Sequence, residues 1–229
     1  MGLELYADIE PLLGFDEEIR SLYDLYIEIL QSWEPASLID IGCGSGAFLA
    51  KAKEALQPER AYGVDLSEKM VRRAREAGVE AERIDLCEVE GRFDAATAVF
   101  DVLNYLPPKE LVRFLGCVEK ILVPGGVFIA DINTLFGFEE VAPGALVRSF
   151  EEKFLALDSI FEDGVLETRI DYFETEKEGR YVRRSDTIVQ YYHRPEEIAR
   201  MSGLELIQSY PLRMYADEPD KEILLFKKR

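Results

Sequence analysis

Short apolar runs alternate with helical patterns over the first 133 residues of the chain. Between 22 and 30, apolar residues recur at helical spacing, which predicts an amphipathic helix that ends before Pro35. The pattern that follows predicts strands at 37–41, 61–65, 82–86, 93–100 and 127–131, and helices at 47–56, 68–77 and 108–122. Alternating strands and helices are typical of βαβ units, which build a parallel sheet covered on both faces. Because such crossovers are right-handed, we expect a doubly wound α/β sheet.

The pattern changes after Asn133. From about 150 to 192, apolar and polar residues alternate with period two, which predicts antiparallel strands with a turn at Glu178-Gly179. A short helix at 195–201 and two closing strands, at 204–212 and 222–228, complete the chain. We therefore expect one α/β domain, divided as 1–34 for an N-terminal helical lid, 35–133 and 193–229 for the main domain, and 134–192 for an antiparallel β insertion. The insertion either covers a site or joins two copies of the chain in a homodimer, and the pattern leaves both open.

Composition excludes several kinds of partner. The 229 residues include 27 Lys and Arg against 45 Asp and Glu, for a formal net charge of −18. A surface that binds nucleic acid or an anionic membrane needs a cationic patch, so we expect neither partner. We expect no signal peptide, since the first residues are acidic, and no membrane span, since no apolar run reaches about 18 residues. Three cysteines without a CxxC pair predict reduced thiols in a cytoplasmic protein.

One glycine-rich loop stands out. The first strand runs directly into Asp40-Ile41-Gly42-Cys43-Gly44-Ser45-Gly46 and then into a helix. Glycines at alternate positions let a ligand approach the backbone and permit positive φ. The loop lies at the carboxyl end of a strand, where open α/β sheets bind ligands.

Acidic residues end the next two strands. Asp65 follows Gly42 by 23 residues and can accept hydrogen bonds from both hydroxyls of a ribose. Asp85 ends the third strand and can accept a hydrogen bond from the exocyclic amine of adenine, with Leu86 beside it. These contacts fall on successive strands in the order in which a nucleoside would lie across them.

With these motifs the chain resembles the class I S-adenosylmethionine-dependent methyltransferases. The matching segments are 40–46, 62–67 with Met70, 84–86, 93–95, 101–106 and 122–126. The resemblance implies a seven-stranded, mostly parallel, Rossmann-like sheet and S-adenosyl-L-methionine as the cofactor.

The resemblance also implies roles for single residues. Gly42, Gly44 and Gly46 would line the methionine part of the cofactor, with Asp40 near its ammonium group. Asp65 would hold the ribose, Leu66 and Met70 would pack near the adenine, and Asp85 and Leu86 would contact it. Phe100 and Asp101 would lie near the sulfonium and the methyl acceptor. Cys43 shares the loop, and we interpret it as a small filler because no Cys/His pair accompanies it.

Methyl transfer needs no protein nucleophile, and a general base only where the acceptor must lose a proton. Candidate acceptor-side residues are Asp101, Asn104 and Tyr105, together with Tyr6 if the N-terminal helix covers the site. His193, the one histidine, is a candidate base or, as we favour, a packing residue. Gln190-Tyr191-Tyr192 either lines an acceptor pocket or is an ordinary strand. The adjacent Asp-Asn pair of metal-dependent relatives is missing, so we expect no metal.

We therefore expect a cytoplasmic enzyme that methylates an N or O atom of a small molecule. Asn104-Tyr105-Leu106-Pro107-Pro108 departs from the Asn/Asp-Pro-Pro-Tyr/Phe motif of enzymes that methylate the amino group of adenine or glutamine. A nicotinamide-dependent oxidoreductase is the first alternative, although its GxGxxG spacing is absent and Asp40 would be a poor neighbour for a pyrophosphate. A regulatory module that binds the cofactor without turnover is the second.

Overall fold

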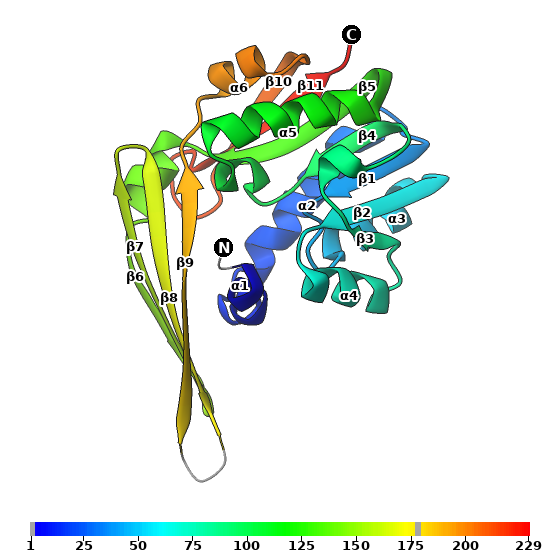
Figure 1. Cartoon of the computed structure of the whole chain (residues 1–229). Coiled ribbons are helices and arrows are strands. Elements are labelled where there is room, and N and C mark those ends of the chain that lie inside the picture. Colours follow the sequence, from blue (N-terminus) through cyan, green and yellow to red (C-terminus); the bar gives the residue numbers. More distant parts are fainter. Residues whose placement is uncertain (1–2, 177–179) are drawn as a thin grey trace.

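A seven-stranded sheet forms the centre of the computed structural model, which describes residues 3–176 and 180–229 (Figure 1). Its strand order is β10 (Glu205–Leu212), β11 (Lys221–Lys227), β5 (Leu122–Asn133), β4 (Phe93–Ala98), β1 (Ser37–Ile41), β2 (Arg60–Asp65) and β3 (Ala81–Arg83). Strands β1 to β5 pair in parallel, whereas β11 pairs antiparallel with both β5 and β10. The predicted seven-stranded, mostly parallel sheet is confirmed.

Helices cover both faces of this sheet. On one face α5 (Pro108–Ile121) and α6 (Pro195–Met201) pack against side chains such as Ile39 and Phe128. On the other face lie α2 (Asp16–Gln31), α3 (Ala47–Leu56) and α4 (Glu68–Glu76), which pack against side chains such as Leu38 and Ile129. Neighbouring residues of one strand thus serve opposite cores, as buried parallel strands require.

The insertion forms a separate antiparallel sheet that projects from the main domain (Figure 1). It consists of β6 (Gly144–Ser149), β7 (Lys153–Glu162), β8 (Val165–Thr175) and β9 (Tyr181–Tyr191), after a short π-helix, η4 (Gly137–Val141). The antiparallel strands expected between 150 and 192 are confirmed. The turn expected at Glu178-Gly179 lies outside the described residues.

The N-terminal segment packs between the insertion and the main domain. It comprises α1 (Leu3–Ile9) and a short 3-10 turn, η1 (Glu10–Leu12). Leu5, Ile9 and Leu13 share a small core with Leu155 and Ile170 of the inserted sheet. Asp8 forms an ion pair with Arg184 of β9 (2.7 Å) and another with Lys69 of α4.

Two local predictions were wrong. The third strand stops at Arg83 rather than Leu86, because Asp85 accepts a hydrogen bond from the Cys87 N–H (2.8 Å) and begins the 3-10 turn η2 (Leu86–Glu88). The fifth strand begins at Leu122, and its backbone runs through Pro124-Gly125-Gly126 with a shift of register against β4.

The expectation of three reduced thiols is also corrected. Cys87 and Cys117 form a disulfide that joins η2 to α5, whereas Cys43 is free and buried. Their Cα atoms lie 5.0 Å apart, inside the range of about 4.4–6.8 Å that a disulfide spans. No helix in the described ranges is long and apolar enough to cross a membrane.

Candidate functional site

A cavity of about 300 Å³ opens at the carboxyl ends of β1, β2 and β4. Pockets that hold drug-sized ligands start at about this volume. The cavity brings together most of the site residues predicted from the sequence: Tyr6, Gly42, Gly44, Asp65, Leu66, Met70, Asp85, Leu86, Phe100, Asp101 and Tyr105. Parallel strands end at the same edge of the sheet, so residues that are far apart in the chain line the same cavity.

The loop after β1 and the end of β2 are joined through Asp65. Its Oδ2 accepts a hydrogen bond from the Gly44 N–H (2.9 Å), and its Oδ1 accepts one from the Ser67 N–H (2.8 Å). Burial raises the pKa of Asp65, while these backbone donors stabilise its ionised form. Each carboxylate oxygen keeps acceptor capacity for a ligand hydroxyl.

Gly44 leaves the space in front of this carboxylate open. Its φ of +53° lies in the left-handed region, and a Cβ built there would meet nothing within 4 Å. A side chain at this position would instead extend into free space beside the cavity. The loop thus presents bare backbone to a ligand.

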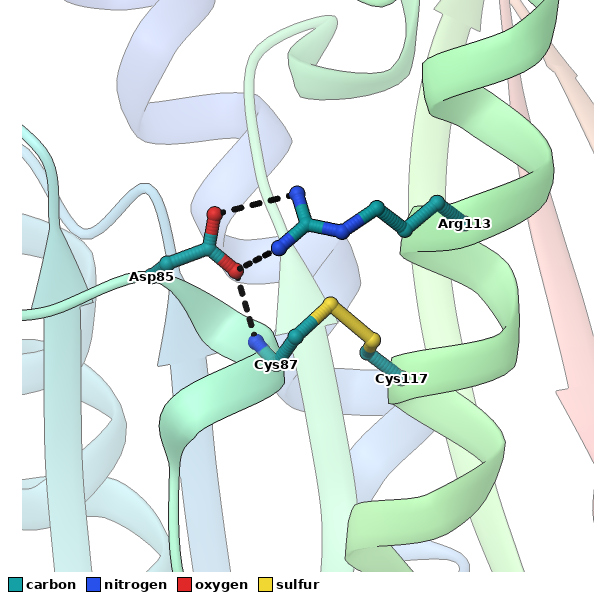
Figure 2. Close-up of a disulfide and its surroundings, with 4 residues drawn as sticks. All are labelled: Asp85, Cys87, Arg113 and Cys117. Carbon is teal, nitrogen blue, oxygen red and sulfur yellow. Dashed lines mark hydrogen bonds and ion pairs between the residues drawn. A yellow bond between two sulfur atoms is a disulfide. The ribbon is translucent and has the colours of Figure 1, made fainter.

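Asp85 lies at the other end of the cavity with its partners already in place (Figure 2). Arg113 of α5 donates to both carboxylate oxygens (3.1 and 3.2 Å), and the Cys87 N–H donates to one of them. The Cys87–Cys117 disulfide crosses the same gap between η2 and α5. An adenine amine would therefore share Asp85 with Arg113, which the sequence did not predict.

The loop after β4 has an unusual backbone. Phe100 and Asp101 both have positive φ, +68° and +51°, a conformation that costs about 1–3 kcal/mol for a residue other than glycine. Asp131 of β5 offsets this cost, because its carboxylate accepts the N–H of Phe100 (2.7 Å) and that of Asp101 (3.0 Å). The pair of N–H groups forms an anion-binding nest around a fully buried carboxylate.

Lys221, which no sequence pattern singles out, completes this cluster. Lys221, only 2% exposed, forms ion pairs with Asp131 (3.1 Å) and with Asp101. The other oxygen of Asp101 accepts from Gln190 of β9 (3.2 Å), and Asp131 also accepts from the Tyr26 hydroxyl (2.7 Å). Burial lowers the pKa of Lys221 to about 7 and raises that of Asp131 to about 6, and the contact between the two opposes both shifts. The cluster fixes the Asp101 side chain at the cavity wall.

A family model described as a methyltransferase domain matches residues 38–126, the segment that contains these strand ends. Over these residues the chain is similar to a methyltransferase domain. Among curated proteins, demethylmenaquinone methyltransferase of Bacteroides fragilis is 30% identical over 134 residues, 53% of this chain and 52% of that protein. Carboxy-S-adenosyl-L-methionine synthase of Nautilia profundicola is 29% identical over 147 residues, 53% of this chain and 62% of that protein. The chain thus spans about half the length of the first and under two thirds of the second.

Solved structures share the fold over almost the whole chain, insertion included. A methyltransferase from Clostridium acetobutylicum has a TM-score of 0.77 at 22% identity, with 99% of this chain and 97% of that chain covered. The sugar N-methyltransferase KedS8 from Streptoalloteichus has a TM-score of 0.75 at 20% identity, covering 99% and 92%. CalS10, an amino pentose methyltransferase from Micromonospora echinaspora solved with S-adenosylmethionine bound, has a TM-score of 0.72 at 21% identity, covering 98% and 97%.

The residues of the cavity fit S-adenosylmethionine. Bare backbone at Gly44 lies next to a carboxylate with free acceptor capacity, Asp65. Leu66 and Met70 supply apolar surface to the same cavity. The acidic side chains of the cavity suit a ligand with positive charge on sulfur and on an ammonium group. When bound, the cofactor supplies a methyl group activated by a positively charged sulfur.

Five of the predicted residues do not line the cavity. Asp40 is buried and accepts from the Thr97 hydroxyl (2.7 Å), and burial raises its pKa to about 7. Burial also raises the pKa of the Cys43 thiol, whose sulfur lies so close to Gly63 that a Cβ there would meet it at 2.8 Å. Gly46 lies against Ala74 of α4. These three residues support the glycine loop from behind.

Asn104 and His193 are the other two. Asn104, in the 3-10 turn η3 (Val102–Tyr105), donates to the Tyr191 carbonyl (2.8 Å) and accepts from the Asn133 N–H (2.9 Å). His193 is hydrogen-bonded to the Leu106 carbonyl (2.9 Å), and burial lowers its pKa. Both hold the inserted segment against the loop after β4.

Proposed function

We propose that the protein transfers a methyl group from S-adenosylmethionine to the nitrogen of a small-molecule amine. One observation carries this proposal: the cavity that contains Gly44 and Asp65 also contains carboxylates and aromatic rings, namely Asp101, Glu10, Tyr6 and Tyr105. Carboxylates and aromatic faces attract ammonium groups. The names of KedS8 and CalS10, which concern a sugar N-methyltransferase and an amino pentose methyltransferase, are consistent with an amine acceptor.

Asp101 is the residue we expect to contact the acceptor. An amine that arrives protonated must give up a proton before its lone pair can attack carbon, and the Asp101 carboxylate is placed to take that proton. Burial raises the pKa of Tyr6 and of Tyr105, so these phenols stay neutral and serve as hydrogen-bonding groups rather than bases. Lys221 and Asp131 position Asp101 without facing the cavity.

We also propose that the N-terminal segment and the insertion together cover the acceptor. Tyr6 and Glu10 line the cavity, while Leu5, Ile9 and Leu13 of the same segment pack on the inserted sheet. The alternative is that the insertion joins two copies in a homodimer. Sedimentation of the purified protein distinguishes them, since a cover works in a monomer.

Thermal unfolding with S-adenosylhomocysteine and with NAD tests the cofactor assignment. A ligand that binds only the folded protein raises the midpoint temperature of unfolding. S-adenosylhomocysteine should therefore raise this temperature, and NAD should not. The reverse result would favour the oxidoreductase. A panel of amines, phenols and carboxylic acids, read by mass spectrometry for products one methyl group heavier, then tests the acceptor. Products from amines support the proposal, and products from phenols or acids alone would contradict the nitrogen assignment.

A further inference from the structure

The disulfide lies in the wall of the cavity itself. Cys87 lines the cavity together with Leu86 and residues of α5, and it is partly exposed. Cys117, a residue of α5, is 8% exposed, and its side chain belongs to the core on that face of the sheet. A nucleophile that attacks this disulfide therefore reaches the Cys87 sulfur from the cavity side, which is the space that the adenine end of the cofactor would fill.

The disulfide joins the two segments that form this end of the cavity. Asp85, Leu86 and Cys87 come from the turn after β3, and Glu110, Arg113 and Phe114 come from α5. Each segment contributes side chains to one continuous wall. A change in their separation therefore changes the shape of the adenine end.

An ion pair also joins these two segments, and it is weaker than the disulfide. Arg113 and Asp85 form an ion pair, but their side chains are 62% and 34% exposed. Ion pairs exposed to this extent contribute little to stability, because water screens them. In addition, β3 is an edge strand of three residues paired with β2 alone. The covalent bond is thus the firmest polar or covalent tie across this wall among the described residues.

From this placement we propose that Cys87–Cys117 is a thiol–disulfide exchange site in the cavity wall, and that its reduction by a dithiol weakens cofactor binding. The inference rests on the cofactor site of the proposed function. In the reaction, a thiolate of the dithiol attacks the Cys87 sulfur and the Cys117 thiolate leaves. The second thiol of the reductant then attacks the reductant's own sulfur in the mixed disulfide, and the Cys87 thiolate leaves. Two electrons and two protons pass to the cysteines, and the dithiol becomes a cyclic disulfide.

Linkage makes the proposal reciprocal. If reduction lowers cofactor affinity, then bound cofactor must resist reduction by the same factor at equilibrium. A ligand over the adenine end also blocks the approach to Cys87 physically. The physical block predicts that S-adenosylhomocysteine slows the reaction of this disulfide with dithiothreitol, and linkage predicts that it shifts the equilibrium toward the disulfide.

Calorimetry with S-adenosylhomocysteine on oxidised and dithiothreitol-reduced protein tests the proposal. We expect the reduced protein to bind at least tenfold more weakly while its far-ultraviolet circular dichroism stays the same. The double variant Cys87→Ala/Cys117→Ala should bind like the reduced protein and ignore the reductant. Cys43→Ala, whatever its own affinity, should keep the ratio between the two redox states, because it retains the bridge.

Alkylation of new thiols, followed by mass spectrometry, gives a second measurement that needs no substituted protein. We expect the two thiols to appear several-fold more slowly with S-adenosylhomocysteine present. Equal affinity of the two redox states within twofold, or no slowing by the ligand, would overturn the proposal. A redox-dependent affinity without methyl transfer to any amine would instead leave this proposal standing and overturn the proposed function.

Discussion

The ammonium of Lys221 lies 3.1 Å from the carboxylate of Asp131, and both side chains are almost completely closed off from solvent. The two strands that carry them are antiparallel neighbours, with Lys221 opposite Asn133 and Asp131 opposite Ile223. The same ammonium contacts Asp101 at the cavity wall. The last strand of the chain therefore fixes a side chain of the site, and loss of this lysine should affect both stability and chemistry.

Lys221→Met should lower the free energy of unfolding by about 3–5 kcal/mol, because removing one partner leaves buried charge without compensation. Urea unfolding measures the change. Lys227→Met is the matched control on the same strand, where the side chain is only partly buried and the ammonium lies over the Trp33 ring, 5.1 Å from its centroid. Equal stability of the two variants would mean that Lys221 does not compensate the carboxylates. The double variant Lys221→Met/Asp131→Asn should recover part of the loss.

Asp65→Asn should weaken the binding of S-adenosylhomocysteine by about 10- to 100-fold, since hydrogen bonds to a charged group contribute about 1.5–3 kcal/mol. Calorimetry gives the affinity directly. Asparagine is a better test than alanine, because its one carbonyl oxygen can still accept one of the two backbone N–H groups that Asp65 binds, whereas alanine would leave both without a partner. Asp158→Asn, at an exposed position on β7, is the control. Unchanged affinity at position 65 would refute the ribose assignment.

The pH dependence of stability should report the burial of Asp40. Its pKa is raised from 3.8 to about 7 in the folded protein, so the folded state keeps a proton that the unfolded chain loses. Its contribution to stability is complete below about pH 4 and is lost as the pH rises toward 7. Each unit of pKa corresponds to about 1.4 kcal/mol.

We therefore expect Asp40→Asn to gain stability relative to the unsubstituted protein between about pH 4 and 7. Urea unfolding of both proteins across this range checks it. Burial also raises the pKa values of Asp131, Asp65 and Glu10, but both proteins contain these groups. Their contributions therefore cancel in the difference between the two free energies of unfolding. A difference that does not change with pH would show that Asp40 titrates normally.

Reduction of the disulfide should also lower global stability. Cys87 and Cys117 are 30 residues apart, and closing a loop of about that size in the unfolded chain corresponds to about 3–4 kcal/mol. Urea unfolding with and without dithiothreitol measures it. The double alanine variant should match the reduced protein, and identical curves in both redox states would contradict the prediction.

Sequence patterns predicted β1, β2 and β4 well because each is a local, largely apolar run that ends near a glycine or an acidic residue. The strand ends then placed Gly44, Asp65 and Asp101 in one cavity. The sequence pattern does not predict the burial of Lys221. This lysine begins a strand 90 residues after Asp131, and only the register between β5 and β11 brings the two residues together. The lysine could have been found only through pairing of distant strands.

Other misses have the same origin. Asn104 looks like an acceptor-side residue in the sequence, yet it binds the Tyr191 carbonyl, whereas His193 binds the Leu106 carbonyl and packs there, as we favoured from the sequence. Asp40 follows the family pattern but faces Thr97 rather than the cavity. The disulfide depends on the distance between η2 and α5, which no spacing of three cysteines reveals. Long-range packing, rather than local propensity, decided these positions.

A crystal structure of the protein with S-adenosylhomocysteine tests the central claim most directly. We predict that the ribose hydroxyls bind the Asp65 carboxylate, that the amino-acid part lies along Gly44, and that the sulfur faces the loop of Phe100 and Asp101. A nucleoside bound away from Asp65, or crystals that never take up the compound at saturating concentration, would contradict the account.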